Sequence, residues 1–243
     1  MAMIRYFAVI SYDGGDYYGF QRLNDRANIQ KTIEKALKGM TQQEILVFVS
    51  GRTDKGVHAI GQVVHFDTEI DLDNEVWVNG INRRLPESIR VVKVKRVKGD
   101  MHARHSAKSK VYEYKISKVP STPFSTRYET YYPNVDINKL TEACKLLEGT
   151  HDFAGFSVYI KDKPTEKTIY SIKVKETKNH ITIRFHGDSF LRYMIRRMVG
   201  LLIEISTNKR KLSDIEKIFL TKDRKIASKT APAKGLYLVK VFY

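Results

Sequence analysis

The feature that most constrains the fold is an interleaving of short apolar strand-like segments with fewer, strongly periodic helical ones. In the helical segments apolar residues recur every three or four positions, which places them on one face of a helix. Several connections between strands are too short for parallel crossovers, so antiparallel pairing is favoured. The expected strands are residues 4–11, 45–49, 63–66, 89–97, 111–116, 169–176, 181–185 and 236–242.

Capping signals and apolar periodicity locate the helices. Asn28 and Asp136 are the expected N-caps of two of them, and residues 77–85 form a third that ends at Pro86. A long helix is expected to start at Phe190, because its apolar face continues through Met194, Met198, Leu201 and Ile205. Ser213 and Glu216 have the spacing of a capping box at the start of a last helix.

A break in the apolar pattern divides the chain into two comparable parts. Lys98-Gly99-Asp100 interrupts the pattern, so we place the boundary within residues 98–108. We therefore predict an α+β protein with two halves, residues 1–103 and 104–243, each a largely antiparallel β-sheet with helices packed on one face.

The charge indicates a polyanionic partner. The 43 Lys and Arg residues exceed the 27 Asp and Glu residues, which leaves a formal charge of +16. A field of that size attracts polyanions, although it does not determine a fold. A membrane surface is disfavoured because no basic amphipathic helix has an apolar face separate from the core pattern. Nucleic acid is therefore the first candidate partner.

Cysteine content and hydropathy indicate a soluble cytoplasmic protein. The single cysteine, Cys144, excludes an internal disulfide and fits a reducing compartment. Residues 1–11 lack the long apolar stretch and cleavage site of an export signal. Residues 198–203 are too short an apolar run to cross a bilayer.

One acidic residue stands out for its position. Asp54 follows the expected strand 45–49 and lies between Gly51 and Gly56, which let the backbone turn sharply and present a carboxylate at the sheet end. Taken alone, an aspartate in such a turn more often bonds to its own backbone as a turn former. The loop by itself therefore leaves turn formation and catalysis both open.

The segment Gly51-Arg52-Thr53-Asp54-Lys55-Gly56-Val57-His58-Ala59 resembles the signature loop of the TruA-type tRNA pseudouridine synthases. Further segments resemble that family in the same order, so the resemblance covers essentially the whole chain. They are Ser11-Tyr12-Asp13-Gly14 with Gly19-Phe20-Gln21, Ala103-Arg104 with Ser106-Ala107 and Lys110 to Tyr114, Gly149 to Phe153, Phe190 to Gly200, and Ala231 to Leu238. The family usually has Trp at Phe20, Ala at Lys55 and Arg at Lys110.

The resemblance implies an enzyme that converts uridine to pseudouridine at positions 38 to 40 of the tRNA anticodon arm. It implies the pseudouridine synthase fold with two related halves, the first carrying the nucleophile loop and the second completing the active-site cleft. It also implies a homodimer that acts without a cofactor or metal.

The resemblance assigns the chemistry to three residues. Asp54 would be the nucleophile, Arg196 would pair with its carboxylate, and Tyr112 would contact the target base and could help to move its proton. Each has a simpler interpretation. Arg196 forms a basic stripe with Arg192 that could be solvated, and Tyr112 shares a strand face with Tyr114 and could be core.

Further residues would bind the substrate. Arg52 would occupy the position that the extruded base vacates, and Leu236 and Leu238 would wall the uracil pocket, although alternating leucines are core by default. Basic residues that could contact phosphates are informative only as a set, because each alone could be a solvated charge. They are Arg22, Arg26, Arg83, Arg84, Arg104, Lys108, Lys110 and Arg192.

Two alternatives remain. A catalytically inactive tRNA-binding protein would share the fold, and a metal-dependent RNA hydrolase would need clustered carboxylates, which the sequence lacks. Neither His58 with His65 nor His102 with His105 has a Cys partner or the spacing of a zinc protease, so we expect no metal site.

Overall fold

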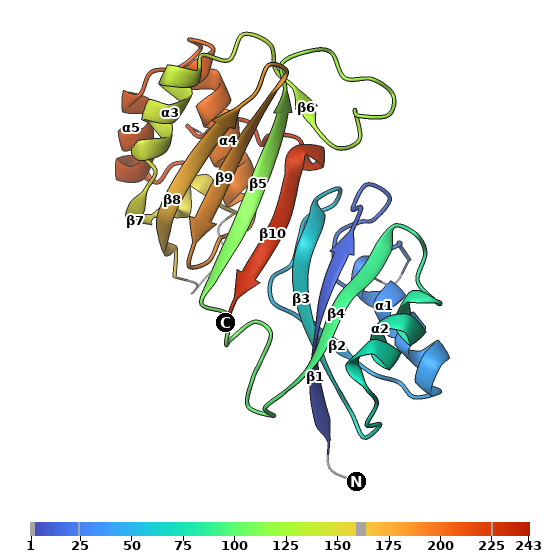
Figure 1. The fold of residues 1–243 in the computed structure, drawn as a ribbon. Helices are drawn as coiled ribbons and strands as arrows, with labels where there is room; N and C mark the ends of the chain where they lie inside the picture. Colours follow the sequence, from blue (N-terminus) through green and yellow to red (C-terminus); the bar gives the residue numbers. More distant parts are fainter. Residues whose placement is uncertain (1–2, 24, 159–163, 225) are drawn as a thin grey trace. The chain divides into compact units, whose positions relative to one another are not determined.

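The computed structural model shows a chain of two compact units. It describes residues 3–23, 25–158, 164–224 and 226–243. The first unit comprises the residues up to Lys108 together with Tyr237–Tyr243, and the second comprises Ser109–Leu236. Each unit contains a largely antiparallel sheet with helices packed against it, which confirms the α+β class (Figure 1). The division into 1–103 and 104–243 stays a prediction. The two compact units follow another division, in which residues 237–243 join the first unit.

The sheet of the first unit is built around two long strands. Its order is β4-β1-β3-β10, with β2 antiparallel to β3. Neighbouring pairs are antiparallel, except that β10 runs parallel to β3, with Tyr237 opposite His58. The strands are β1 (Ile4–Tyr12), β2 (Val47–Val49), β3 (His58–Thr68), β4 (Ile89–Val97) and β10 (Leu236–Phe242).

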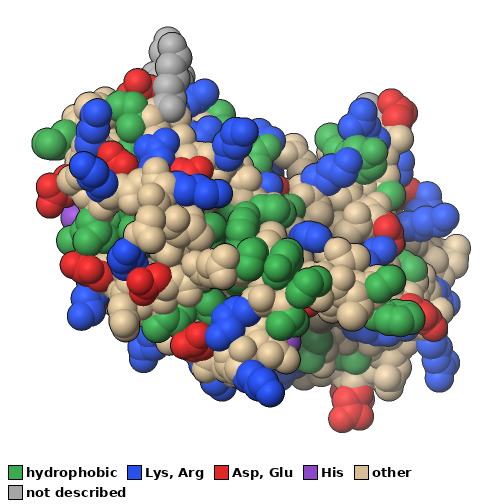
Figure 2. All heavy atoms as spheres, turned by 90° about the horizontal axis from the view of Figure 1, so that it is seen from above, with side chains coloured by type: hydrophobic (Ala, Val, Ile, Leu, Met, Phe, Trp, Pro, Cys, Tyr) green, Lys and Arg blue, Asp and Glu red, His purple; other side chains and the backbone are tan. Residues whose placement is uncertain are grey.

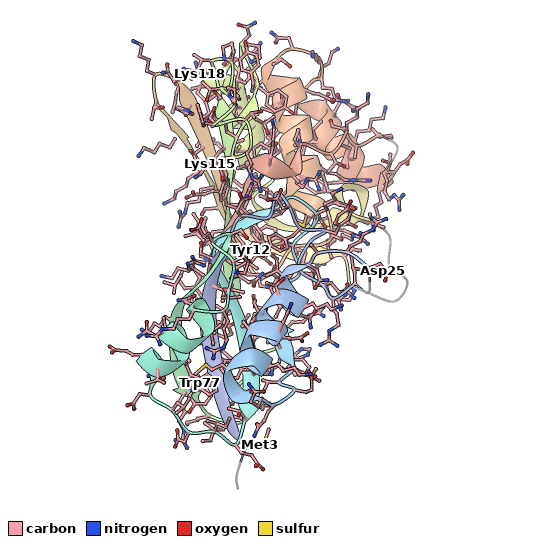
Figure 3. The ribbon with its side chains drawn as sticks, turned by 90° about the vertical axis from the view of Figure 1, so that its right-hand side faces the viewer. Met3, Tyr12, Asp25, Trp77, Lys115 and Lys118 are labelled. Atoms are coloured by element: carbon pink, nitrogen blue, oxygen red, sulfur yellow. The ribbon has the colours of Figure 1, made fainter. Side chains whose placement is uncertain are left out.

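Helices α1 (Ile29–Thr41) and α2 (Asn74–Asn82) cover one side of this sheet. Trp77 lies between α2 and the sheet (Figure 3), where it is fully buried against Tyr6 and Phe66 with ring centroids 5.4 and 5.2 Å away. Asn28 caps α1 as predicted, because its side chain accepts a hydrogen bond from the Lys31 N–H.

The predicted extent of the second helix, residues 77–85, was wrong at its C-terminal end. α2 ends at Asn82, three residues before Leu85. The Asn82 amide donates to the Val91 carbonyl and its oxygen accepts from the Val91 N–H, both at 2.8 Å. This pair of hydrogen bonds ties the helix end to β4 and takes the chain out of the helix before Pro86.

The other side of the first sheet is covered by an aromatic cluster. The His65 ring stacks on Phe48 with centroids 4.9 Å apart and meets the edge of His102 at 4.5 Å. Phe7 packs against Tyr243 at 5.0 Å. The Ala103 N–H donates to His65 Nδ1 at 3.1 Å, and the Ala103 carbonyl accepts from the Tyr243 hydroxyl at 2.7 Å. The segment near Ala103 is therefore fastened to the sheet.

The sheet of the second unit has the order β5-β9-β8-β7, with β6 parallel to β5, and the helices pack on one of its faces. None of the helices among the described residues is long and apolar enough to span a membrane. The strands are β5 (Ser109–Ser117), β6 (Thr130–Tyr131), β7 (Gly149–Asp152), β8 (Glu166–Glu176) and β9 (His180–Gly187). The helices are α3 (Ile137–Lys145), α4 (Met194–Ser206) and α5 (Ser213–Thr221), with short 3-10 turns η1 (Phe153–Phe156) and η2 (Ala233–Gly235).

Two predictions about the helix starts of this unit were wrong. α4 begins at Met194 rather than Phe190, because Tyr193 adopts a left-handed conformation with φ 65°. The capping box does not form, since Ser213 is itself the first helical residue and no side chain of the described residues caps α5. Asp136 caps α3 as predicted by accepting from two backbone N–H groups.

His65 generates a prediction about pH. Burial lowers the pKa of His65 from 6.5 to about 4, and its Nδ1 accepts the Ala103 N–H only when it is unprotonated. The folded state therefore favours the neutral ring. The contribution of His65 to the free energy of unfolding is fully present above pH 6.5 and is lost as the pH falls toward 4. When the pH is lowered from 7.5 to 5, the free energy of unfolding measured in urea should fall by about 2 kcal/mol because of His65.

The comparison that checks this contribution is His65→Asn, which cannot titrate. Its unfolding free energy should depend less on pH over the same range than that of the wild type. Equal pH dependence of the two proteins would contradict the assignment to His65.

Candidate active-site residues

Asp54 lies in the loop of residues 50–57 that joins β2 to β3 in the first unit. Its side chain is partly exposed, whereas the neighbouring Thr53 is buried. The Val57 N–H donates to the Asp54 carbonyl at 3.1 Å, and Gly56 has φ +77° within that turn. A positive φ at this position strongly favours glycine. The loop therefore turns sharply directly after Asp54.

The loop is anchored by the turn of residues 14–20 that follows β1. The Phe20 N–H donates to the Thr53 carbonyl at 3.2 Å. A Cβ on Gly19, which has φ +93°, would lie 2.8 Å from that same carbonyl oxygen, and one on Gly14 would lie 2.0 Å from the Val57 carbonyl oxygen. Backbone therefore packs directly on backbone, and only glycine fits at both positions. The opening motif and the signature loop of the sequence are thus in contact.

A buried polar network lies behind the loop. The Tyr12 hydroxyl is 2.8 Å from Thr53 Oγ1, and the Gln62 amide donates to the Gly51 carbonyl at 2.8 Å. Gln62 also accepts from the Ser50 hydroxyl at 2.9 Å. Burial raises the pKa of Tyr12 to about 12, so its phenol stays neutral and able to donate. Side chains from β1 and β3 thus hold both ends of the loop segment before Asp54.

Tyr112 lies on β5 in the second unit, on the helix side of the sheet with Tyr114 and Ile116. It is 7% exposed, whereas the other two are fully buried, and its ring meets the edge of Phe190 with centroids 5.3 Å apart. The Tyr114 hydroxyl donates to the Pro232 carbonyl at 2.9 Å. This contact fastens the segment before β10 to β5.

Arg196 is fixed in the first turn of α4 by the same segment. Its Nε–H donates to the Ala231 carbonyl at 2.7 Å, and the Ala231 N–H donates to the Arg196 carbonyl at 2.9 Å. The guanidinium carbon lies 5.5 Å from the centroid of the Tyr193 ring, which Arg192 also approaches at 5.0 Å. The left-handed Tyr193 thus places its ring beside both arginines, a feature that the sequence pattern did not reveal.

The remaining predicted substrate residues divide between the units. Arg52 and Leu238 belong to the first unit, where Arg52 is exposed next to Asp54 and Leu238 is fully buried. Leu236 belongs to the second unit and is 6% exposed.

The candidate phosphate contacts differ in exposure and in their partners. Arg22 forms two contacts with Glu34, of 2.5 and 3.0 Å. Of the other candidate phosphate contacts, Lys110 is partly exposed, and Arg26, Arg83, Arg84, Arg104, Lys108 and Arg192 are exposed.

The histidine pairs singled out in the sequence have other partners. His58 Nδ1 accepts from the Gly14 N–H at 3.1 Å and its ring stacks on Tyr237, while His65 and His102 belong to the aromatic cluster. Within the described ranges, no group of three or more His, Cys, Asp or Glu side chains is arranged to hold a metal ion.

The network behind the loop generates a prediction. Tyr12→Phe should destabilise the fold by about 1–2 kcal/mol, because the buried Thr53 hydroxyl loses its partner. It should also speed trypsin cleavage after Arg52 and Lys55, both exposed on the loop, as followed by mass spectrometry. The matched control is Tyr6→Phe, which removes a hydroxyl contact of 2.9 Å to Asp71 near the start of β1, away from the loop. Equal loop cleavage in both variants would contradict the anchoring role.

Comparison with known proteins identifies the family. A family described as tRNA pseudouridine synthase matches residues 8–106 and 143–243. The chain is 42% identical over 238 residues to tRNA pseudouridine synthase A of Aster yellows witches'-broom phytoplasma, covering 98% of both chains. It is 41% identical to that of Phytoplasma mali over 100% of both chains. It is 40% identical to that of Streptococcus pneumoniae strain JJA over 99% of both.

Asp54, Arg196 and the segments that anchor them all fall within the two matched ranges. The chain therefore belongs to the tRNA pseudouridine synthases, which are isomerases.

Proposed function

We propose that this enzyme converts uridine to pseudouridine at positions 38 to 40 of the tRNA anticodon arm, with Asp54 as its nucleophile. The observation that carries the proposal is the setting of Asp54, a partly exposed carboxylate on a loop whose backbone is anchored by the turn of residues 14–20. Preorganisation of this kind is what a reacting group needs, because a misplaced nucleophile reacts slowly.

The reaction rearranges one nucleotide without a change in oxidation state. The bond between ribose C1′ and uracil N1 breaks, the base turns over, and C1′ joins C5, while a proton leaves C5 and one is added at N1. A carboxylate suits this sequence because it can form a covalent adduct and then leave. Attack on the sugar, attack on the base and a glycal route all use the ionised form of Asp54.

Arg196 is the proposed partner of that carboxylate. Its reciprocal hydrogen bonds with Ala231 and its place beside the Tyr193 ring fix the guanidinium in one orientation. A fixed guanidinium can form two parallel hydrogen bonds with a carboxylate and favours the ionised form. The charge of Arg196 would thus keep Asp54 reactive.

Tyr112 and Arg52 are proposed to handle the target base. Tyr112 offers an aromatic surface supported edge-on by Phe190, together with a phenol that can exchange a proton. Arg52 is exposed on the nucleophile loop and would fill the space that the extruded uridine leaves. Leu236 and Leu238 would form the apolar wall of the pocket.

The proposed partners are tRNA and a second copy of the chain, in the cytoplasm. Basic side chains predominate over acidic ones on the face shown in Figure 2, in agreement with the formal charge of +16. Such a surface attracts the phosphate backbone of RNA.

Replacement of Asp54 tests the central assignment. Asp54→Asn keeps the shape of the side chain and removes the nucleophile, so the rate of pseudouridine formation should fall at least about 1,000-fold while tRNA affinity changes little. The measurement is base-resolved mapping of pseudouridine in transcribed tRNA. Equal product from the variant would contradict the role of Asp54, and absence of product from the wild type would favour a catalytically inactive tRNA-binding protein.

Replacement of Arg196 tests its pairing with the nucleophile. Arg196→Lys keeps the charge and loses the planar fork, so we expect kcat to fall about 10- to 100-fold. The neighbouring Arg197 is the control, because Arg197→Lys alters a cation on the same helix turn that contacts the Gly155 carbonyl instead. If single-turnover kinetics gave the same loss for both variants, the pairing with Asp54 would be wrong.

A further inference from the structure

A basic groove of about 560 Å³ runs along α1 in the first unit. Four cations line it, namely Arg26 and Lys31 near the start of the helix, Lys35 one turn further on, and Arg84 after α2. Lys31, Lys35 and Arg84 are exposed, and none of the described residues that line the groove is acidic. The groove therefore concentrates positive charge in a hollow open to solvent.

This arrangement places like charges close together on one helix. Lys31 and Lys35 are four residues apart, so they are neighbours on the helix surface, and like charges at that spacing repel each other. The acidic side chains Glu44 and Glu34 near α1 lie outside the groove, where Glu44 pairs with Lys38 and Glu34 accepts from Arg22. A bound anion would relieve the repulsion inside the groove.

Gly39 forms part of the floor of the groove and Arg84 forms part of its wall. Gly39 leaves room for the stem of Arg84, since a Cβ there would lie 3.3 Å from Arg84 Cδ. The Arg84 guanidinium donates to the Gly80 carbonyl at 2.9 Å, which holds it at the wall. Ala27, Thr32 and Ala36 also line the groove, and their small side chains leave its floor open.

The Tyr18 ring, which two cations contact, lies between the groove and the nucleophile loop. The Arg26 guanidinium carbon lies 4.5 Å from the centroid of the exposed Tyr18 ring, and Lys55 Nζ lies 4.0 Å from the same centroid. Cation–π contact holds both charges in place although they repel each other. Since Lys55 directly follows Asp54, positive charge continues within this unit from the loop to the groove.

We propose that the α1 groove binds consecutive phosphates of the tRNA strand that leads to the target uridine, with Lys55 contacting the phosphate nearest to it. This inference rests on the proposed function and adds a path for the RNA on the first unit. The four groove cations and Lys55 would contact phosphates and not the edges of bases. They would therefore contribute affinity and register rather than sequence preference.

The test uses the full enzyme and a transcribed tRNA. Lys31→Ala/Lys35→Ala should keep the helix intact, because alanine favours helix more than lysine. Its tRNA Kd should rise about 10-fold near physiological salt, and the slope of log Kd against log salt should fall by about 1.5 for two lost phosphate contacts. Lys31→Arg/Lys35→Arg retains the charge and should restore most of both values.

The matched control is Lys93→Ala/Lys95→Ala. These two exposed lysines lie on β4 and, by their register with Val9 and Phe7, face away from the helices of the first unit. The control should bind tRNA within about two-fold of the wild type. Equal affinity and equal salt slope for the groove variant and this control would overturn the inference.

The outcome is separable from that of the proposed function. Wild-type pseudouridine formation combined with no effect of the groove variant would overturn the groove and leave the enzymatic assignment intact. Loss of binding in the groove variant, with no product from the wild type, would support the groove and overturn the assignment.

Discussion

The structure of the loop that carries Asp54 depends on a close approach between two stretches of backbone. The turn of residues 14–20 packs on residues 53–57 at Gly14 and Gly19, where a Cβ would collide with carbonyl oxygens. Because the contact involves main chain on both sides, it fixes the path of the loop more tightly than flexible side chains could. Asp54 is thus presented by a backbone that is already in place before substrate binds.

The second unit uses the same principle with different groups. The segment of residues 231–235 is held on β5 by the Tyr114 hydroxyl and on α4 by the reciprocal hydrogen bonds of Arg196 and Ala231. Gly235 lies against the Tyr114 ring, where a Cβ would be 2.7 Å from a ring carbon. Each unit therefore holds in place one side chain, Asp54 or Arg196, that the proposed chemistry requires.

Local signals in the sequence predicted most elements, because periodicity and capping act over a few residues. The caps Asn28 and Asp136 were correct, and Asp54 was correctly placed in the loop after a short strand. That strand was predicted as residues 45–49 and buried, whereas β2 comprises only Val47–Val49 and Phe48 is exposed, because β2 pairs with β3 alone among the described strands. The start of α4 was wrong because no local pattern announces the left-handed Tyr193. The contact of Gly14 and Gly19 with the loop, and the contact of Lys55 with the Tyr18 ring, join residues more than 30 positions apart, so only the fold reveals them.

The most direct test of the central claim, that the loop is held rigid before substrate binds, is site-resolved hydrogen exchange of the free enzyme. The Phe20 amide donates to the Thr53 carbonyl and the Val57 amide to the Asp54 carbonyl. If the loop is anchored, both amides should exchange as slowly as those in the paired centres of β1 and β3. Exchange at the rate of an unprotected surface loop would contradict the account.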